Sequence, residues 1–484
     1  MSPLILFSFV IAYFLILLAV AWVTGKNSTN ESFFIGNKSS NWMLVAFGMV
    51  GTSLSGVTFV SVPGAVAKDG FAYFQITIGY LIGYVAIAFV LLPLYYRLNL
   101  TSIYNYLSSR LGVKSYKTGA SFFILSRTLG ATARLYLVVN ILQETILSSF
   151  GVPFWATTLI ILSMILLYTF EGGVKTIVWT DTLQTTCMLL GLIICVVYIL
   201  NTLHIGFGGS IEAMNQKGYS TIFNFNPDSK LFFLKQIIAG AFITITMTGM
   251  DQEMMQKNIS VKTLKDSQKN ILSMSVILTF SIVLFLYLGG LLYLYAEQQQ
   301  VIETGDKLFP AIALNHMPPF VSVIFIIALI SALFPSADGA ITALTSTFCQ
   351  DILGIQRNNT LTEARKKKIR QRVHLCFAAI FLLFVLVFKV VNSPSMIGII
   401  LKIASYTYGP LLGLFTFGII MKRQVKDNLV PFICLAAPLI CLVIDLNQKT
   451  LFGSFELGLE LLIINGLITF IGLFMVSIPQ TVKE

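Results

Sequence analysis

The sequence predicts an all-α membrane protein with thirteen transmembrane helices. Of its 484 residues, 56% are hydrophobic and only 11% are charged, and the mean hydropathy is +0.83. Apolar runs of about 20 residues, the length that crosses about 30 Å of hydrocarbon, recur from the N-terminus nearly to the end. This pattern leaves no room for a separate soluble domain and excludes the soluble classes of protein.

The apolar runs define the spans, which are numbered from zero. The first run, Leu4 to Val23, has neither a basic segment before it nor a small-residue cleavage site, so we expect a retained span and not a signal peptide. The thirteen predicted spans cover residues 3–24, 41–67, 71–96, 118–148, 152–170, 176–203, 231–250, 270–296, 318–349, 373–393, 396–421, 429–446 and 456–478.

Basic residues predict the orientation. Lys and Arg gather in the connections that follow even-numbered spans, most densely from Arg365 to Arg372. The positive-inside rule then places the N-terminus outside and the C-terminus in the cytoplasm of a multi-pass inner (plasma) membrane protein. Topology and contact with the lipid bilayer therefore explain the formal charge of +11, and no nucleic-acid partner is expected; a lipid-headgroup role for the basic run stays open.

Spans 1 to 5 and 6 to 10 form two five-helix sets that start from opposite sides of the membrane, the parity of an inverted repeat. The predicted units are residues 1–40 (leading span and cytoplasmic loop), 41–204 (first repeat), 205–230 (extracellular loop), 231–422 (second repeat) and 423–484 (two C-terminal spans).

The first span of each set is interrupted by small and polar residues. Matched broken helices favour a binding site at the membrane midplane, although small residues also occur at tight helix contacts. The interrupting residues are Gly48, Gly51, Thr52, Ser53, Ser55, Gly56 and Thr58 in span 1, and Gly240, Thr244, Thr246, Thr248 and Gly249 in span 6.

Five ionisable side chains lie inside the predicted spans: Arg127, Arg134, Asp181, Asp338 and Lys402. Placing a charged group in the membrane costs free energy, so each of them is expected to have a structural or functional role. Arg134 lies midway along span 3, which suits either a planar clamp for a solute carboxylate or a structural ion pair with an acid such as Glu144. Arg127 is expected to be structural. Asp181 and Asp338 lie at comparable depths and can flank a cation site or share a proton.

The stretch from Glu171 to Gln184 (EGGVKTIVWTDTLQ) resembles the signature of the sodium/solute symporter family. Supporting matches are Glu31-Ser-Phe-Phe-Ile-Gly, Gly249-Met-Asp251-Gln252 with Gln256, Asp351, and Tyr408-Gly-Pro-Leu-Leu-Gly413. The resemblance implies sodium as the coupling ion, alternating access, and a leucine-transporter-like core of ten helices in a 5+5 inverted repeat.

The resemblance also implies ion sites. The family's common sodium site falls on the backbone of Gly51 and Leu54 and on Ala332, Pro335 and Ser336; Pro335 stands where the family usually has a hydroxyl residue. A second site found in some members falls on Asp181, Asp338 and Gly339, where an extra carboxylate replaces hydroxyls, so the identity of its ion stays open.

At the solute site the chain is similar to the bacterial sialic acid transporters of this family. The positions implied to bind the solute are Ser53, Ser55, Thr58, Phe71, Gln75, Arg134 and Phe242. We therefore expect a sodium-coupled symporter for a small, anionic organic solute, with sialic acid (N-acetylneuraminate) as the best candidate.

Other solutes and other classes of protein remain as alternatives. A sugar, a polyol or a monocarboxylate is the alternative solute within the family. A membrane solute sensor is less favoured, because no kinase or receiver segment follows the last predicted span. An enzyme is not expected, since His204, His316 and His374 are scattered and form no catalytic arrangement.

Overall fold

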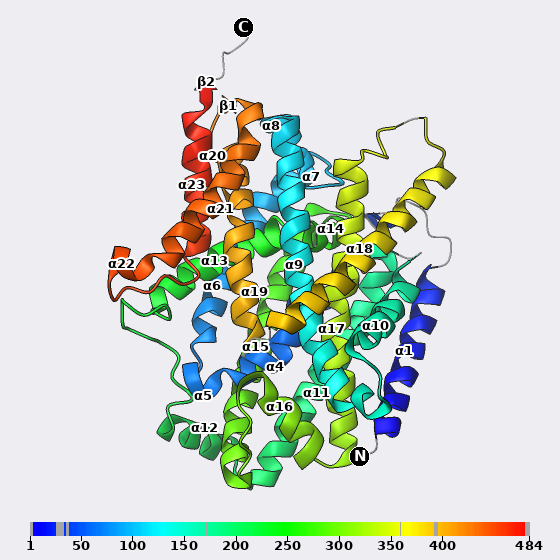
Figure 1. Cartoon of the computed structure of the whole chain (residues 1–484), viewed down its shortest axis with the longest axis vertical. Helices are drawn as coiled ribbons and strands as arrows, with labels where there is room; N and C mark the ends of the chain where they lie inside the picture. Colours follow the sequence, from blue (N-terminus) through cyan, green and yellow to red (C-terminus); the bar gives the residue numbers. More distant parts are fainter. Residues whose placement is uncertain are drawn as a thin grey trace.

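Apolar helices stand side by side along the long axis of the molecule (Figure 1). The computed structural model describes residues 3–25, 33–34, 38–170, 173–358, 360–391 and 395–479. Within the sequence motifs, Glu31, Ser32, Ile35, Gly36, Glu171 and Gly172 lie outside the described residues. The start of the first helix and the last described strand lie at opposite ends of the molecule.

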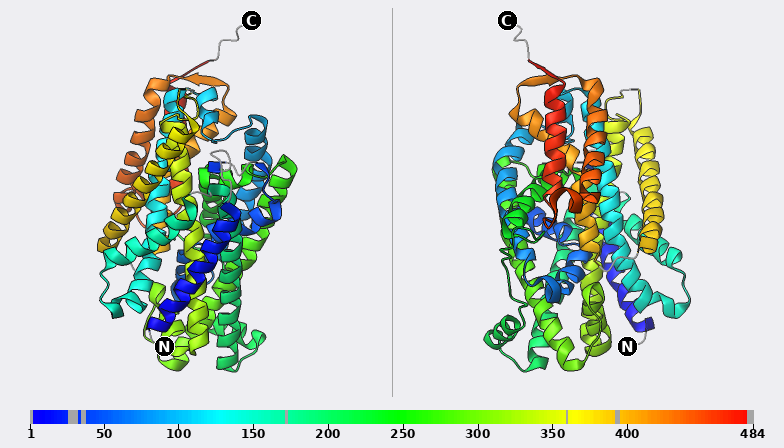
Figure 2. Two further views of the ribbon diagram at one scale, coloured as in Figure 1. Left: turned by 90° about the vertical axis from the view of Figure 1, so that its right-hand side faces the viewer. Right: turned by 60° about the vertical axis from the view of Figure 1, so that its left-hand side comes forward.

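Eight helices in the described part of the chain are long and apolar enough to cross a membrane. They are α1 (Pro3–Gly25), α6 (Tyr73–Ala86) continued by η2 (Ile87–Leu91) and α7 (Leu92–Arg97), α9 (Val113–Thr145), α11 (Gly173–Leu203), α15 (Leu264–Gln299), α17 (Pro319–Thr347) continued by η7 (Phe348–Ile352), α18 (Glu363–Val391) and α21 (Val430–Leu446). In Figure 2, α1 faces the viewer in the left view and α23 (Leu461–Met475) comes forward in the right view, on opposite sides of the bundle.

Three further candidates are helix pairs that bend sharply at a short break. They are α3 (Trp42–Ser53) with α4 (Gly56–Gly64), bent by 54°; α13 (Phe233–Thr244) and η4 (Ile245–Gly249) with α14 (Gln252–Ile259), bent by 64°; and α19 (Met396–Thr407) with α20 (Gly409–Ile420), bent by 45°. The structure thus has eight to eleven candidate spans among the described residues. The count of thirteen and the 5+5 inverted repeat stay predictions.

Shorter elements complete the described chain. Two are apolar helices at predicted spans, α10 (Phe154–Thr169) and α23. The connections hold α5 (Val66–Asp69), α8 (Asn105–Arg110), η3 (Leu147–Phe150), α12 (Phe207–Gln216), η5 (Gly305–Lys307), α16 (Leu308–Ala311), η6 (Ile312–His316), η8 (Asp427–Leu429) and α22 (Gln448–Phe452). Strand β1 (Arg423–Val425) pairs antiparallel with β2 (Ser477–Pro479).

Two predicted connections are helical instead. The segment after predicted span 6 contains α14, whose eight residues are all buried. The basic run from Arg365 to Arg372 lies on α18, which begins at Glu363 and not at residue 373. Hydropathy missed both segments because their side chains are polar: α14 is a separate helix after a 64° bend, and the basic run is the first part of the continuous helix α18.

Small residues allow α3 to pack closely on α11. A Cβ at Gly48 would lie 3.1 Å from the Asp181 Cβ, and one at Gly51 would collide with the Thr185 hydroxyl. Farther along α11, a Cβ at Gly191 would lie 2.5 Å from the Ala328 Cβ of α17. The glycines of span 1 therefore serve close helix contacts as well as preceding the break in the helix.

At the break between α19 and α20, a side chain of another helix donates hydrogen bonds to backbone carbonyls of the interrupted helix. Pro410 has no backbone N–H to donate to Tyr406 one turn earlier. The Asn465 side chain of α23 donates instead to the backbone oxygens of Ser405 and Tyr406, at 3.1 and 2.8 Å. Gly409 admits this side chain, because a Cβ there would collide with Asn465.

Candidate solute and ion sites

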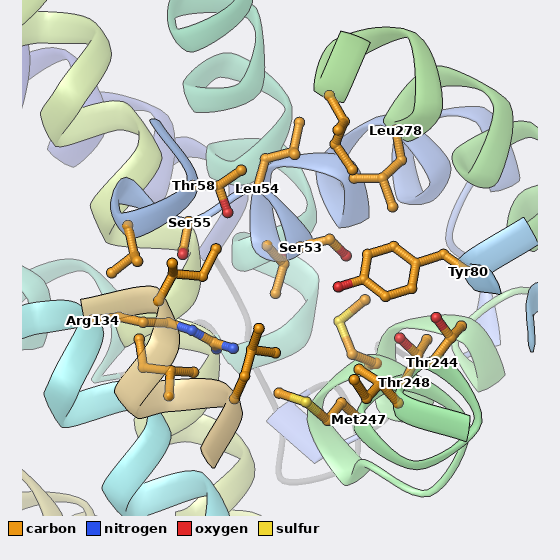
Figure 3. Close-up of a pocket in the computed structure, with 18 of the residues that line it drawn as sticks. Ser53, Leu54, Ser55, Thr58, Tyr80, Arg134, Thr244, Met247, Thr248 and Leu278 are labelled. Carbon is orange, nitrogen blue, oxygen red and sulfur yellow. The ribbon is translucent and has the colours of Figure 1, made fainter. Parts of the chain in front are cut away.

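A cavity of about 100 Å³ lies beside the break between α3 and α4 (Figure 3). Helices α15 and α19 contribute only apolar side chains to its lining, whereas α3, α4, α6, α9, α13 and η4 contribute hydroxyl or guanidinium groups. The lining residues that carry the argument are Ser53, Ser55, Thr58, Tyr80 and Arg134. The three bent helix pairs, α3 with α4, α13 with α14 and α19 with α20, thus all contribute side chains to one cavity.

Arg134 supplies a cation to this cavity. In Figure 3 its guanidinium enters from one side, while the Tyr80 hydroxyl points in from the opposite side toward Ser53. No acidic side chain in the described part of the chain lies within ion-pair distance of Arg134. Glu144, the partner considered from the sequence, instead accepts a hydrogen bond from Asn140 at 2.9 Å. The guanidinium therefore faces the cavity with its donors available.

Arg127 lies about two turns earlier on α9 and also reaches the cavity lining, but it is paired. It donates to the Glu253 carboxylate and lies 3.8 Å from Asp251. The expectation that Arg127 is structural agrees with these contacts.

The helix break places backbone groups at the cavity edge. Helix α3 ends at Ser53, and Leu54 leaves the helical conformation with φ −86° and ψ 77°. Helix α4 begins at Gly56, and its N-cap residue, Ser55, makes no side-chain capping bond. Carbonyls at the end of α3 can bind a cation, and amides at the start of α4 can meet an anion.

The two helices expected to carry the common sodium site, α3 and α17, meet near this break. Helices α3 and α17 are in contact, and a Cβ at Gly56 would lie 3.8 Å from the Leu333 Cα. Pro335 lies inside α17 and cannot donate to the Ser331 carbonyl. The Ser336 hydroxyl donates to the Leu333 carbonyl at 2.8 Å. Helix α17 thus offers backbone and hydroxyl oxygens, the ligands that a hard cation prefers, on a helix that contacts α3.

Three predicted solute contacts lie outside the cavity lining. The buried Gln75 side chain donates to the Ala72 and Leu231 carbonyls, each at 3.2 Å, and accepts from the Asn224 amide at 3.2 Å. Phe71 and Phe242 are partly buried against the hydrophobic core. Gln75 thus holds the segment before α13, whereas Ser53, Ser55, Thr58 and Arg134 come together at the cavity.

Helix α14 is buried because its polar groups have partners. The Asp251 side chain caps its start by accepting from the Glu253 and Met254 amides at 2.9 and 3.3 Å. The Tyr95 and Tyr104 hydroxyls donate to the carbonyls of Gly249 and Met250, at 2.7 and 2.9 Å, which the break exposes. In the Gly-Met-Asp-Gln motif, the Gly249 and Met250 carbonyls thus accept hydrogen bonds at the break, and Asp251 caps the helix that follows.

A buried charge cluster links α14 to α9, α11 and α3. Lys257 donates to the Asp181 carboxylate at 2.7 Å and to the Thr52 hydroxyl at 2.7 Å. Its ammonium also lies 3.7 Å from Glu253, which pairs with Arg127. Asp181 therefore faces a cation supplied by the chain itself.

Asp338 lies in the same polar layer, on α17. It accepts from the Tyr168 hydroxyl at 2.7 Å and from the backbone amide of Gly339. A Cβ at Gly339 would collide with Glu253, so this glycine lets α14 approach α17. Asp181 Oδ1, Thr185 Oγ1 and Thr342 Oγ1 are buried without a hydrogen-bond partner among the described residues, and such oxygens fit a sodium ligand set.

Sequence reasoning missed Glu253 and Lys257, since both fall in a segment that was expected to be a connection. The available signal was their spacing of four residues, which places an acid and a base on one helical face.

The chain is similar in sequence to known sodium-coupled transporters. The model of the Sodium:solute symporter family matches residues 33–427. Sodium-coupled monocarboxylate transporter 1 of Mus musculus is 26% identical over 83% of this chain and 66% of its own length. The sodium/sialic acid symporter NanT of Aliivibrio fischeri is 22% identical over 83% of this chain and 80% of its own. The chain thus spans slightly less than two thirds of the length of the mouse relative.

Solved structures show the same fold. A sodium-coupled sialic acid symporter in a substrate-bound, outward-open state matches with a TM-score of 0.83 at 19% identity, over 97% of both chains. Mhp1, a transporter of the nucleobase-cation-symport-1 family, matches with a TM-score of 0.59 at 13% identity, over 93% of this chain and 95% of its own.

Proposed function

The chain belongs to the sodium:solute symporter family, and on that premise we propose that it imports a small organic anion together with sodium. The family consists of multi-pass membrane transporters, and the relatives named above are transporters and not enzymes. The observation that carries the anionic character of the solute is Arg134, whose guanidinium faces the cavity without an ion pair in the described part of the chain.

A solute carboxylate at Arg134 would receive two parallel hydrogen bonds from a planar donor. Ser53, Ser55 and Thr58 would offer hydroxyls to the rest of the solute. A guanidinium in a cavity with a large apolar wall discriminates against neutral solutes, because the buried cation gains most from a partner of opposite charge.

Sialic acid is the solute that we expect from the sequence, and it suits the hydroxyl-rich side of the cavity. A short monocarboxylate is the second candidate. The cavity holds about 100 Å³, its wall includes Ile243, Ile282, Ile397 and Leu401, and Phe71, Gln75 and Phe242 do not line it. The small volume favours a smaller anion.

Sodium is the transported ion in this proposal and not a resident cofactor. The common site would use the backbone of Gly51 and Leu54 with Ala332, Pro335 and Ser336, and a second ion would use Asp181, Asp338 and Gly339. Sodium bound at the break would order α3 and α4 before the solute enters, and the ten-helix core would then expose both to the other side. The orientation is the one expected from the basic residues, with the C-terminus in the cytoplasm of the inner membrane.

Uptake into proteoliposomes tests this function. We expect an inward sodium gradient to drive accumulation of N-acetylneuraminate or of pyruvate, and an equal potassium gradient to drive neither. Uptake that runs equally well in potassium with a proton gradient would contradict sodium coupling.

A further inference from the structure

The Lys257 ammonium is the cation that pairs with Asp181. The Lys257 side chain is only 3% exposed, and its ammonium donates to both Asp181 and Thr52 at 2.7 Å. Thr52 itself donates to the same Asp181 oxygen at 3.2 Å. An ammonium is a compact monovalent cation that is bound by oxygens, so it uses the same kind of ligand as sodium.

A second acceptor for Lys257 lies beside the first. Glu253 Oε1 is 3.7 Å from the ammonium and has no hydrogen-bond partner among the described residues. Glu253 and Lys257 share one face of α14, where residues four apart are neighbours, so a small movement of the Lys257 side chain would close this distance. Lys257 can therefore leave Asp181 without becoming an uncompensated buried charge, which is the step that would otherwise be prohibitive.

The charge of the cluster favours an additional cation. The described residues bring together four carboxyl groups, those of Asp181, Asp251, Glu253 and Asp338, with two basic groups, those of Arg127 and Lys257. When all four carboxyl groups are ionised, they outnumber the nearby basic groups even with Arg134 included, and a monovalent cation would stabilise this arrangement. The free Oδ1 of Asp181 and the free hydroxyl of Thr185, one turn away on α11, offer oxygens for it.

We propose that Lys257 is an internal cation that competes with sodium for Asp181, and that Glu253 accepts Lys257 when sodium binds. This inference rests on the proposed sodium symport and adds a positioning residue to it. Sodium binding then exchanges one cation for another at Asp181, and the displaced ammonium is kept within the protein.

The same contacts connect Asp181 to the solute cavity. Arg127 holds Glu253 and also lines the cavity. A solute carboxylate bound at Arg134 would also attract Arg127, which lines the same cavity, and would weaken its hold on Glu253. Glu253 would then be a better partner for Lys257 and would leave Asp181 to sodium. Solute and sodium thus favour one arrangement, and each strengthens the binding of the other.

Two substitutions with opposite expected signs test the proposal. Purified wild-type protein, Lys257→Met and Glu253→Gln are titrated with sodium alone at pH 8.5, with potassium keeping the ionic strength constant, and the melting temperature is recorded. We expect Lys257→Met to lower the sodium concentration for half-maximal stabilisation about 10-fold, equivalent to about 1.4 kcal/mol. Glu253→Gln should raise that concentration by a similar factor, because Lys257 loses its alternative partner.

Two controls assign the effect to Asp181. Lys402→Met removes another intramembrane lysine that pairs with an aspartate, Asp445 at 2.8 Å, but its side chain is 62% exposed; it should leave the sodium titration unchanged. Adding Asp181→Asn to Lys257→Met should abolish the gain in sodium affinity.

An unchanged sodium titration in folded Lys257→Met would overturn the proposal, as would shifts of the same sign in both variants or a gain that potassium reproduces. If Lys257→Met does not fold, the direction of the Glu253→Gln shift decides. Failure of the proposed function looks different, because wild-type protein would then transport no anion in a sodium gradient, whatever Lys257 does.

Discussion

Two arginines on α9 have opposite environments although they lie about two turns apart on one helix. Arg127 pairs with Glu253 and lies near Asp251, whereas Arg134 has no ion pair in the described part of the chain and faces the cavity. A buried charge held by its own chain serves the fold or the internal coupling. A buried charge left for an outside partner marks a binding site.

The largest expected effect is at Arg134. We expect Arg134→Ala to weaken binding of the transported anion by at least about 30-fold, because truncating one partner of a buried charge pair costs about 2 kcal/mol or more. Arg134→Lys should recover little, since it loses the two parallel donors. Solute uptake and equilibrium solute binding are measured for both variants. Normal solute affinity in Arg134→Ala would show that Arg134 does not bind the solute carboxylate.

Arg127→Met should affect the fold more than the solute. Removing this guanidinium leaves Glu253 without its close basic partner, and breaking a buried pair costs about 3–5 kcal/mol. We expect a lower melting temperature and a lower yield, with part of the loss recovered in Arg127→Met/Glu253→Gln. Equal damage in the single and double variants would show that the charge pair is not the cause.

The sequence predicted the elements that hydropathy controls. It predicted the long spans and the interruption of span 1, because glycines and hydroxyl residues from Gly48 to Thr58 stand out in an apolar run. It also identified Arg134 as an intramembrane charge that needs a partner.

The sequence did not predict that α14 is a buried helix. Gln252–Ile259 reads as a polar connection, and it is buried only because its partners come from distant segments: Arg127 on α9, Asp181 on α11 and the Phe34 carbonyl, which accepts from Gln256. For the same reason Gln75 was expected at the solute, although its amide holds the backbone of residues 224 and 231. Such pairings depend on tertiary packing and leave no periodic signal in the chain.

Asp181→Asn tests whether a second sodium ion binds at Asp181 in addition to the one at the common site. If Asp181 holds a second sodium, the Hill coefficient for sodium should fall from near 2 toward 1 while transport persists, and Asp338→Asn should behave in the same way. Sodium-dependent initial rates of uptake measure this. Wild-type cooperativity in both variants would favour a proton site or a structural counter-charge.

Ser336→Ala should have a smaller effect, confined to the common site. Losing one neutral ligand costs about 1 kcal/mol, so we expect the sodium concentration for half-maximal transport to rise about 5-fold. Solute affinity at saturating sodium should hardly change. Ser322→Ala is a matched control, since Ser322 lies on the same helix and donates to the Ala313 carbonyl at 2.8 Å; an equal shift in both variants would argue against a sodium ligand at Ser336.

The smallest effect on the solute is expected at Gln75. Because the side chain bonds only to backbone groups of the described residues, Gln75→Ala should lower the melting temperature and change solute affinity less than about 2-fold, within the range of one neutral hydrogen bond. A large loss of affinity without a change in melting temperature would return Gln75 to the solute site.

We expect Arg134 to bind the carboxylate of the transported solute in a sodium-dependent way. Pairs of acid and methyl ester, N-acetylneuraminate and pyruvate with their esters, differ at the group that Arg134 would contact. In a thermal-shift titration, we expect one of the acids to stabilise wild-type protein in sodium but not in potassium. Its ester should stabilise the protein far less, and Arg134→Ala should remove this difference. Equal stabilisation by acid and ester, or an unchanged preference for the acid in Arg134→Ala, would contradict this expectation.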